Sequence, residues 1–420
     1  MKIVINALLE GGRAGGVQNG IAVLARALSS ADIGDHEVGF LTLEGHDDWL
    51  RSIVGSSALS LHPIGRGTTR TTASRLRRWR AGRQLESGAI WLRDVAGRPE
   101  AGTGTFEALG ADVVHFPYQR AELSTVPMVY QPWDLQHRHL PHLFSRASAR
   151  YRDRLYRAYC QAAAVVVVPT KFVRDDVIAS YEIEPSKVIV VAPFVADGSH
   201  RHGIDSSIAA EQTGSARPLD DLGEPFAVYP ARTWKHKNHA GLIEALAICR
   251  RNGTDIPLKC TGAPLGNEDA LLALARDLGV IDLVEFNGFV SAHDLADLQR
   301  RARLLVFPSK FEGWGYPVLE SFEHGVPVAC SNGTWLDDAA SDAALRFDPD
   351  CPSAIAASLR QLWTDESLRR DGIERGLEHL QSFTTNRMAT AYLSVYEAAS
   401  RRSFRTLGTM MDSGSTTQTV

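Results

Sequence analysis

Residues 307–327 read FPSKFEGWGYPVLESFEHGVP, and this stretch decides how the second half of the chain is interpreted. The short apolar run at 304–307 predicts a buried strand, and a glycine-rich loop follows at 312–316. Pro317 suits the first position of a helix, where its missing N–H and preset φ do no harm. Glu320 then falls in the first helical turn, which completes a strand, loop and helix of the kind found in α/β sheets.

This junction has features that suit an anion. Gly313 and Gly315 let the backbone pass close to a ligand, and the helix that begins after Tyr316 offers N–H groups with partial positive charge. The Glu320 carboxylate can accept two hydrogen bonds from neighbouring hydroxyls, such as those of a ribose. A phosphate-bearing sugar donor fits this arrangement. Alternatively, Glu320 only complements the helix dipole and Glu312 is a solvated loop residue.

Length and composition limit the classes of protein to consider. A chain of 420 residues exceeds the size at which a single core usually stops growing, so we expect two domains. A net charge of −4 favours no nucleic-acid partner. The five cysteines are widely spaced without a CxxC pair, which predicts neither disulfides nor a zinc site and favours a reducing, cytoplasmic compartment. The start of the chain resembles a strand rather than a signal peptide, and no apolar run approaches the ~20 residues that cross a bilayer.

Strand-like and helical segments alternate along most of the chain, which predicts parallel sheets with helices on both faces. Residues 196–224 lack periodicity and are interpreted as a linker. We therefore expect an α/β protein with two Rossmann-like, doubly wound domains, 1–195 and 225–385, whose strands point their carboxyl ends at a central cleft. The predicted strands are 2–8, 37–43, 113–116, 128–130, 165–169, 188–191, 226–229, 258–261, 284–286, 304–307 and 328–330, and the predicted helices are 17–28, 171–180, 239–251, 269–278, 292–301 and 317–324.

Two segments stand outside this alternation. The end of the chain predicts helices at 353–363, 366–381 and 386–400, followed by a tail at 404–420 that we expect to be disordered because it lacks periodicity. Residues 66–98 carry nine arginines with Trp79 and Trp91 between them. Such a stretch can lie on an anionic membrane surface, or it can be the solvated face of a helix.

A basic loop follows the first predicted strand of the second domain. Residues 229–238 read YPARTWKHKN, which places Arg232 and Lys237 just past the carboxyl end of that strand. Two cations there can clamp a diphosphate and stabilise the charge that it gains as a leaving group. A solvated basic loop is the alternative. Because the 312–320 junction follows another strand of the same sheet, we expect the two features to converge.

Two loops of the first domain are further candidates. Gly11, Gly12, Gly15 and Gly16 join the first strand to a helix, where backbone N–H groups can approach a phosphate or the reacting sugar, or the glycines form a simple turn. The GGRAGG spacing is not GxGxxG, so a dinucleotide cofactor is disfavoured and no cofactor is expected.

The segment after the strand at 128–130 carries Trp133, Asp134 and His137. Trp offers an apolar face to a sugar ring, and His can donate to a hydroxyl or exchange a proton, although both can be structural. His115 has apolar neighbours and is expected to be a core histidine. Metal binding is not expected, because no element carries ligands at a suitable spacing.

The residues named so far resemble glycosyltransferase family 4, retaining enzymes with the GT-B fold and a pair of glutamates separated by seven residues. Further similarity lies at Asn238, 261–262, 288–290, 331–332 and 343–349, and in the first half at 15–17 and 24–28, so the resemblance covers nearly the whole chain. The positions that fit the hallmark pattern are Pro308, Ser309, Glu312, Gly313, Gly315, Pro317, Leu319, Glu320, Gly325, Pro327 and Val328.

The resemblance implies a role for each matching residue. Arg232 and Lys237 would hold the donor diphosphate, and Glu320 would bind the ribose. Glu312 would face the transferred sugar near its reacting carbon. Gly16 would lie near the phosphate and the acceptor.

The family fold also implies that the last long helix, at 386–403, packs back on the first domain. Two positions depart from the family pattern. Many members carry a His-Asp or His-Glu pair where Trp133 and Asp134 stand, so either Trp133 stacks on the sugar or His137 replaces the histidine. Asp338 stands where a glutamate is common and would take its part.

The resulting hypothesis is a retaining, metal-independent transfer of a hexose from a nucleoside diphosphate sugar to a saccharide or lipid-linked saccharide, in surface polysaccharide or O-antigen synthesis. The segment 134–137 favours mannose from GDP-mannose over a UDP-sugar. We expect a cytoplasmic protein with peripheral contact to the inner face of an anionic membrane. Two alternatives share the architecture, a nucleotide-sugar epimerase and a non-catalytic nucleotide-sugar-binding protein, and the presence of four charged site residues together disfavours the second.

Overall fold

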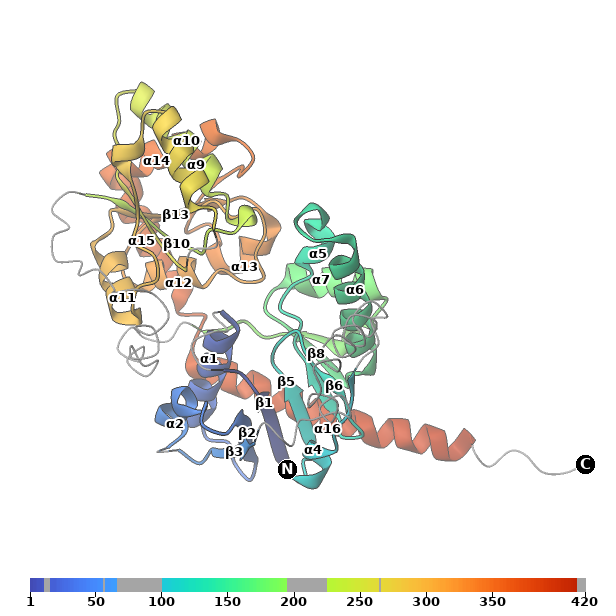
Figure 1. Cartoon of the computed structure of the whole chain (residues 1–420). Coiled ribbons are helices and arrows are strands. Elements are labelled where there is room, and N and C mark those ends of the chain that lie inside the picture. Colours follow the sequence, from blue (N-terminus) through green and yellow to red (C-terminus); the bar gives the residue numbers. More distant parts are fainter. Residues whose placement is uncertain (11–15, 56, 66–99, 195–224, 264–265, 414–420) are drawn as a thin grey trace, which may run out of the picture. The chain divides into compact units, whose positions relative to one another are not determined.

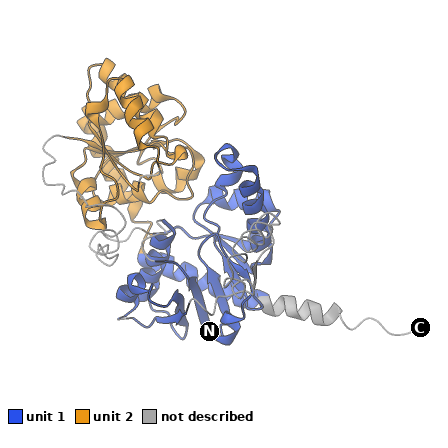
Figure 2. Cartoon of the chain, viewed as in Figure 1, with its two compact units in different colours: residues 1–193, 385–420 blue, residues 194–384 orange. Residues whose placement is uncertain are grey.

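The computed structural model describes residues 1–10, 16–55, 57–65, 100–194, 225–263 and 266–413. Gly15, the predicted linker and the arginine-rich stretch at 66–98 lie outside these residues. The chain divides into two compact units, Met1–Pro193 with Thr385–Val420, and Phe194–Thr384 (Figure 2). Each unit is built on a parallel sheet, as the alternation of strands and helices predicts.

In the first unit, the described strands follow the order β3-β2-β1-β5-β7-β8-β9. Strand β1 pairs in parallel with β2 on one side and with β5 on the other, so the strand order reverses between β1 and β5. Strand β8 consists of four valines, all buried, as expected for a strand covered on both faces. The strands are β1 (Lys2–Ala7), β2 (Glu37–Leu43), β3 (Ser60–Ile64), β5 (Val113–Phe116), β7 (Met128–Tyr130), β8 (Val165–Val168) and β9 (Val188–Val190).

The helices of the first unit pack on this sheet and on one another (Figure 1). Helix α1 (Gly16–Ser30) packs against α2 (Asp48–Val54) and α16 (Thr385–Ser413), and α16 also contacts β5, β7 and β8. Helices α6 (Arg146–Ala162) and α7 (Lys171–Tyr181) contribute to the core around β5, β7 and β8. The shorter elements are β4 (Glu100–Ala101), α4 (Thr105–Ala108), β6 (Glu122–Leu123) and α5 (Gln136–His139).

Buried hydrogen bonds join the last helix to the first unit. His115 Nδ1 of β5 and the Tyr396 hydroxyl of α16 lie 3.0 Å apart. The Tyr392 hydroxyl donates to Gln131 Oε1 at 3.0 Å. Burial lowers the pKa of His115 to about 3, so its ring is neutral at pH 7. His115 is therefore a core histidine, as its apolar neighbours in the sequence predict.

Helix α16 begins at Thr385, one residue before the predicted helix at 386–403, and its bounds run to Ser413. These bounds do not test the disorder expected for the tail at 404–420, which stays a prediction.

In the second unit, the described strands follow the order β12-β11-β10-β13-β14-β15, and this order reverses between β10 and β13. Helices α9, α10 and α14 lie on one side of the sheet, and α11, α12 and α15 lie on the other (Figure 1). The elements are β10 (Ala227–Pro230), α9 (His239–Arg251), β11 (Leu258–Thr261), α10 (Glu268–Asp277), β12 (Val284–Phe286), α11 (Ala292–Arg301), β13 (Leu304–Phe307), α12 (Tyr316–Glu323), β14 (Val328–Ser331), α13 (Asp337–Ala340), β15 (Leu345–Phe347), α14 (Pro352–Thr364) and α15 (Glu366–Leu380).

The predicted elements of both units are confirmed. The elements that were not predicted are α2, α6, β3, β15 and the short elements β4, α4, β6, α5 and α13. Helix α6 is rich in arginine, and its buried residues Leu155, Tyr156, Tyr159 and Cys160 form a narrow stripe. Strand β3 contains Pro63, which weakens a strand pattern, and it pairs at the edge of the sheet. Strand β15 has only three residues. None of the described helices combines the length and the apolar character required to cross a membrane.

Candidate active site

The loop after β10 carries Arg232 and Lys237, and its backbone is held in place by buried side chains. Lys237 ends a short 3-10 turn, and the Tyr229 hydroxyl of β10 donates to the Lys237 carbonyl oxygen at 2.6 Å. The next residue, Asn238, has φ of 60°, a conformation that asparagine tolerates better than most residues. Its Nδ2 donates to the Pro349 carbonyl oxygen at 2.7 Å. These bonds fix the main chain on both sides of the Lys237 side chain.

The loop after β13 is fixed in a similar way. The Ser331 hydroxyl of β14 donates to the Ser309 carbonyl oxygen at 2.7 Å, and the Lys310 N–H donates to the His236 carbonyl oxygen at 2.7 Å. Gly315 ends the loop with φ of 120°, and a Cβ there would lie 2.7 Å from Leu336 Cδ2. Only glycine fits that position without strain. Helix α12 begins directly after it.

The two loops bring opposite charges together. Lys237 Nζ lies 2.5 Å from Glu312 Oε1, although the two residues are 75 positions apart in the sequence. The side chains are only 16% and 14% exposed. Glu312 is therefore not a solvated residue of an exposed loop, because the Lys237 ammonium and the surrounding loops cover it. The predicted convergence of the two strand ends is confirmed for this pair.

Arg232 lies beside an exposed aromatic ring. Its guanidinium carbon is 5.8 Å from the centroid of Trp234, which is 46% exposed. The Trp234 ring also lies 5.4 Å from that of His236. In the part of the chain that the structure describes, no ion pair joins Arg232 to a carboxylate. Burial lowers the pKa of His236 to about 4, the positive charge of Lys237 adds to this effect, and Glu312 opposes it.

Glu320 sits inside the second unit, only 5% exposed. Gln299 of α11, which is fully buried, lies 3.5 Å from Glu320 Oε2 through its Nε2. Glu320 is the fifth residue of α12, and no acidic residue stands in the first turn of this helix, so the predicted first-turn position of Glu320 is wrong by one turn.

The remaining candidates lie in the first unit. Gly16 is exposed at the start of α1, and a Cβ added there would meet no atom within 4 Å. Trp133 has φ of 68°, and its Nε1 donates to the Pro117 carbonyl oxygen at 2.8 Å. Its ring lies against Gly20 of α1, where a Cβ would be 2.6 Å from Trp133 Cζ2. Trp133 thus braces the loop after β7 against α1.

Asp134 and His137 contact other residues of the first unit. Asp134 Oδ1 accepts the Gln136 N–H at 3.0 Å. His137 is only 3% exposed, its ring meets Tyr156 edge-on at 5.2 Å, and its Nε2 is 3.6 Å from Asp153 Oδ1. Burial lowers the pKa of His137 to about 4, against the opposing charge of Asp153. In this conformation His137 is packed in the core, where a sugar could not reach it.

Sequence reasoning did not identify Tyr229, Gln299 or Arg346. Arg346 of β15 donates to the carbonyl oxygens of Ser331 and Gly333, which fixes the loop after β14. It also contacts Asp337 at 3.0 Å. Of these three residues, only Tyr229 carried a signal in the sequence, namely its position near the carboxyl end of β10.

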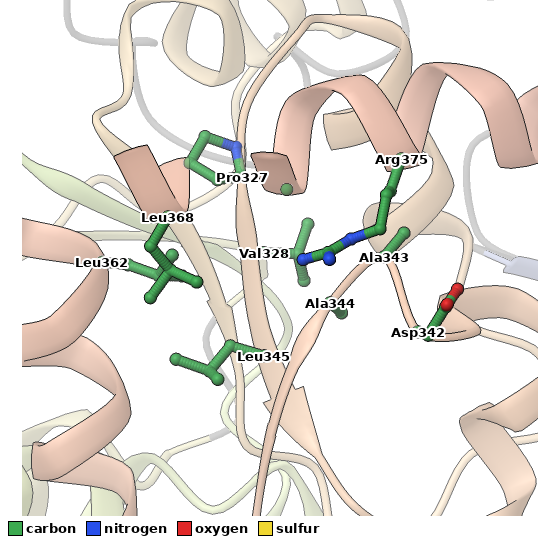
Figure 3. Close-up of a pocket in the computed structure, with 10 residues that line it drawn as sticks. Pro327, Val328, Asp342, Ala343, Ala344, Leu345, Leu362, Leu368 and Arg375 are labelled. Atoms are coloured by element: carbon green, nitrogen blue, oxygen red, sulfur yellow. The ribbon is translucent and has the colours of Figure 1, made fainter. Parts of the chain in front are cut away.

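A cavity of about 120 Å³ lies elsewhere in the second unit. Leu345, Leu362 and Leu368 gather on one side, and Arg375 reaches across it toward Val328 (Figure 3). The cavity lies at the amino ends of β14 and β15, whereas Lys237 and Glu312 follow the carboxyl ends of β10 and β13. The cavity is therefore separate from the candidate active site.

Within the described residues, no group of three or more His, Cys, Asp or Glu side chains is arranged to hold a metal ion. Lys237 and Glu312 follow the carboxyl ends of β10 and β13, between which the strand order reverses, and this is the place where doubly wound sheets bind their ligands.

Comparison with known proteins identifies the family. The model for Glycosyltransferase Family 4 matches residues 14–197, and the model for Glycosyl transferases group 1 matches residues 212–379. The chain belongs to the group 1 type of glycosyltransferases, which adopt the GT-B fold.

The chain matches only part of the length of its curated relatives. O-antigen chain mannosyltransferase B of Escherichia coli is 27% identical over 61% of this chain and 66% of its own. D-inositol 3-phosphate glycosyltransferase of Streptomyces avermitilis is 29% identical over 57% of this chain and 52% of its own. The chain thus spans between about half and two thirds of these relatives.

Solved structures share the fold across nearly the whole chain. Anabaena HepE in complex with UDP and glucose has a TM-score of 0.63 at 16% identity and covers 95% of this chain and 100% of its own. WaaG, a glycosyltransferase involved in lipopolysaccharide biosynthesis, has a TM-score of 0.59 at 17% identity and covers 94% of this chain and 99% of its own. At these identities the likeness concerns the fold alone.

Proposed function

We propose that this protein transfers a hexose from a nucleoside diphosphate sugar to a saccharide acceptor, with retention of configuration and without a metal ion. The acceptor is a saccharide or lipid-linked saccharide in the synthesis of a surface polysaccharide or O-antigen. Membership of the group 1 glycosyltransferases supports the reaction class.

The meeting of Lys237 and Glu312 carries this proposal. A cation for the leaving group and a carboxylate for the transferred sugar stand side by side where the strand order of the second unit reverses. Arg232 and Lys237 hold the donor diphosphate, Glu320 binds the ribose, and Glu312 faces the sugar near its reacting carbon. Gly313, Gly315 and the α12 N-terminus let the backbone approach the phosphates.

The proposed reaction is a front-face displacement. The bond between the sugar C1 and the phosphate oxygen breaks, and the bond between C1 and the acceptor oxygen forms on the same face. The acceptor proton passes to the departing diphosphate oxygen. Arg232 and Lys237 stabilise the negative charge that the diphosphate gains, which is the main electrostatic demand of the step.

Mannose from GDP-mannose is our proposed donor. The likeness to an O-antigen chain mannosyltransferase supports it. A UDP-sugar is the second candidate, because a neighbour of the same fold has been solved with UDP and glucose. Of the two candidates for the place of the family's loop histidine, we assign Trp133, since His137 is packed against Tyr156.

A screen of GDP- and UDP-sugars for binding and slow hydrolysis tests the proposal without knowledge of the acceptor. We expect release of nucleoside diphosphate from one donor, retention of the α or β configuration of the sugar by NMR, and unchanged activity in EDTA. Glu312→Ala abolishes the turnover. Asp350→Asn, which removes the carboxylate that pairs with Lys310 at 2.5 Å, is the matched control and leaves it unchanged.

Other outcomes would point elsewhere. An epimeric sugar without nucleoside diphosphate release indicates an epimerase, and binding without any turnover indicates a binding protein. Full activity of Glu312→Ala contradicts the assignment of the site.

We also propose peripheral membrane contact through the arginine-rich stretch at 66–98, in keeping with a lipid-linked acceptor. Flotation with vesicles that contain an anionic lipid should recover the protein, and neutral vesicles should not. Failure of the anionic vesicles to recover it removes this part of the proposal.

A further inference from the structure

The Lys237–Glu312 ion pair is close, sheltered and exclusive. Its two side chains are largely buried, and the atoms lie 2.5 Å apart. Among the described residues, no second carboxylate pairs with the Lys237 ammonium, and no second cation pairs with Glu312. Lys237 also lies 5.6 Å from the ring centroid of Phe307, which shields one side of the ammonium. In this structure the lysine assigned to the diphosphate is therefore already occupied by an anion of the protein itself.

The backbone around the pair is fixed, so only the side chains are available to change partners. The Tyr229 hydroxyl holds the Lys237 carbonyl, and the Lys310 N–H bonds to the His236 carbonyl between the two loops. Ser331 holds the Ser309 carbonyl. Lysine and glutamate have long side chains with several rotatable bonds, so the pair can separate by rotamer changes alone.

A donor diphosphate would compete directly with Glu312. Two anions that share one lysine repel each other strongly in a sheltered site, and the diphosphate carries more charge than a carboxylate. Arg232 has no ion pair with a carboxylate in the described part of the chain, so it can bind the diphosphate without breaking an ion pair. Glu312, once displaced, would remain on the same loop beside the sugar.

We propose that Glu312 stays paired with Lys237 until the donor binds. The donor diphosphate then pairs with Lys237 instead, which releases the Glu312 carboxylate for the sugar. This inference rests on the proposed function and deepens it. Glu312 then has opposite effects on the two parts of catalysis: its charge weakens the binding of the nucleotide, and its carboxylate is required for transfer.

Calorimetric titration of the full chain with UDP and with GDP tests this exchange. We expect Glu312→Gln to bind the accepted nucleotide about tenfold more tightly than the wild type, equivalent to ~1.4 kcal/mol, while transfer or hydrolysis is lost. Glu312→Met, which cannot hydrogen-bond to Lys237, should also bind more tightly. Lys237→Met should bind more weakly, and the Lys237→Met/Glu312→Gln double variant should bind as weakly as Lys237→Met alone.

The control is Asp350→Asn, because it removes a carboxylate from a lysine of the neighbouring loop without touching Lys237. It should bind the nucleotide as the wild type does. Melting temperatures of all variants show whether each is folded.

Unchanged or weaker binding by both Glu312 variants overturns the exchange, even when Lys237→Met binds weakly and the donor site itself stands. Wild-type affinity in Lys237→Met, or no binding of UDP or GDP by any variant, overturns the donor site and the exchange with it.

Discussion

Replacement of Tyr229 by Phe tests how the candidate active site is held together. The Tyr229 hydroxyl is buried, donates to the Lys237 carbonyl oxygen at 2.6 Å and lies 3.2 Å from the Ser309 hydroxyl. It therefore links the loop that carries Lys237 to the loop that carries Glu312. Phenylalanine fills the same space but leaves the Lys237 carbonyl without this donor.

The expected loss of stability follows from the Lys237 carbonyl, which lacks this hydrogen-bond donor in the variant. A buried polar group that loses its partner costs about 1–3 kcal/mol. For a unit of this size, each kcal/mol corresponds to a fall in melting temperature of about 2–4 °C. Because the Lys237 turn is no longer anchored, we also expect the dissociation constant of the accepted nucleoside diphosphate to rise at least about threefold.

Tyr130→Phe is the matched control. Tyr130 is equally buried, and its hydroxyl donates to the Gln119 carbonyl oxygen at 3.0 Å, but it lies in the first unit. Urea unfolding should show that the free energy of unfolding falls by a similar amount in both variants. Calorimetry should show weaker nucleotide binding only for Tyr229→Phe. Equal nucleotide affinity in Tyr229→Phe and the wild type would refute the idea that Tyr229 positions Lys237.

Two further predictions concern the first unit and the buried histidines. Gly20→Ala should lower the free energy of unfolding by about 1–3 kcal/mol, because its Cβ would lie 2.6 Å from Trp133. Gly16→Ala should leave the free energy of unfolding unchanged, because a Cβ there meets no atom within 4 Å. Equal melting temperatures for the two variants would contradict the packing of Trp133 on Gly20. Burial lowers the folded-state pKa to about 3 for His115 and to about 4 for His137, His236 and His239. The unfolded chain therefore binds more protons below about pH 6.5, so the stability that these groups contribute is complete above that pH and falls as the pH drops, by at most about 1.4 kcal/mol per pH unit for each histidine. Urea unfolding at pH 7, 6 and 5 measures how the free energy of unfolding changes with pH, and this change should be smaller in His236→Gln. A wild-type free energy of unfolding that does not change over this range would count against buried neutral histidines.

The order of strands and helices could be predicted from the sequence because their periodicity is local. The four valines of β8 and the apolar run of β13 identify themselves as buried strands without reference to any other part of the chain. Helix α6 was not predicted because its many arginines obscure a narrow apolar stripe in the sequence.

The candidate site could be predicted only in part. A loop position after a parallel strand follows from the sequence, and this placed Arg232, Lys237, Glu312 and Glu320 at strand ends or at the following helix. Whether a side chain there is exposed, paired or buried depends on neighbours that are distant in the sequence. His137 shows the difference, because Tyr156 and Asp153 of α6 enclose a ring that local sequence could equally assign to a ligand.

The sequence by itself determined that this chain forms parallel α/β sheets and which loops carry its charged residues, since both follow from patterns within a few residues. The tertiary structure alone decided that Lys237 and Glu312 form an ion pair. Their contact requires β10 and β13 to be neighbours, which happens only because the strand order reverses between them. It also requires Tyr229, Lys310 and Ser331 to hold the two loops in register, and no local pattern encodes hydrogen bonds between such distant segments.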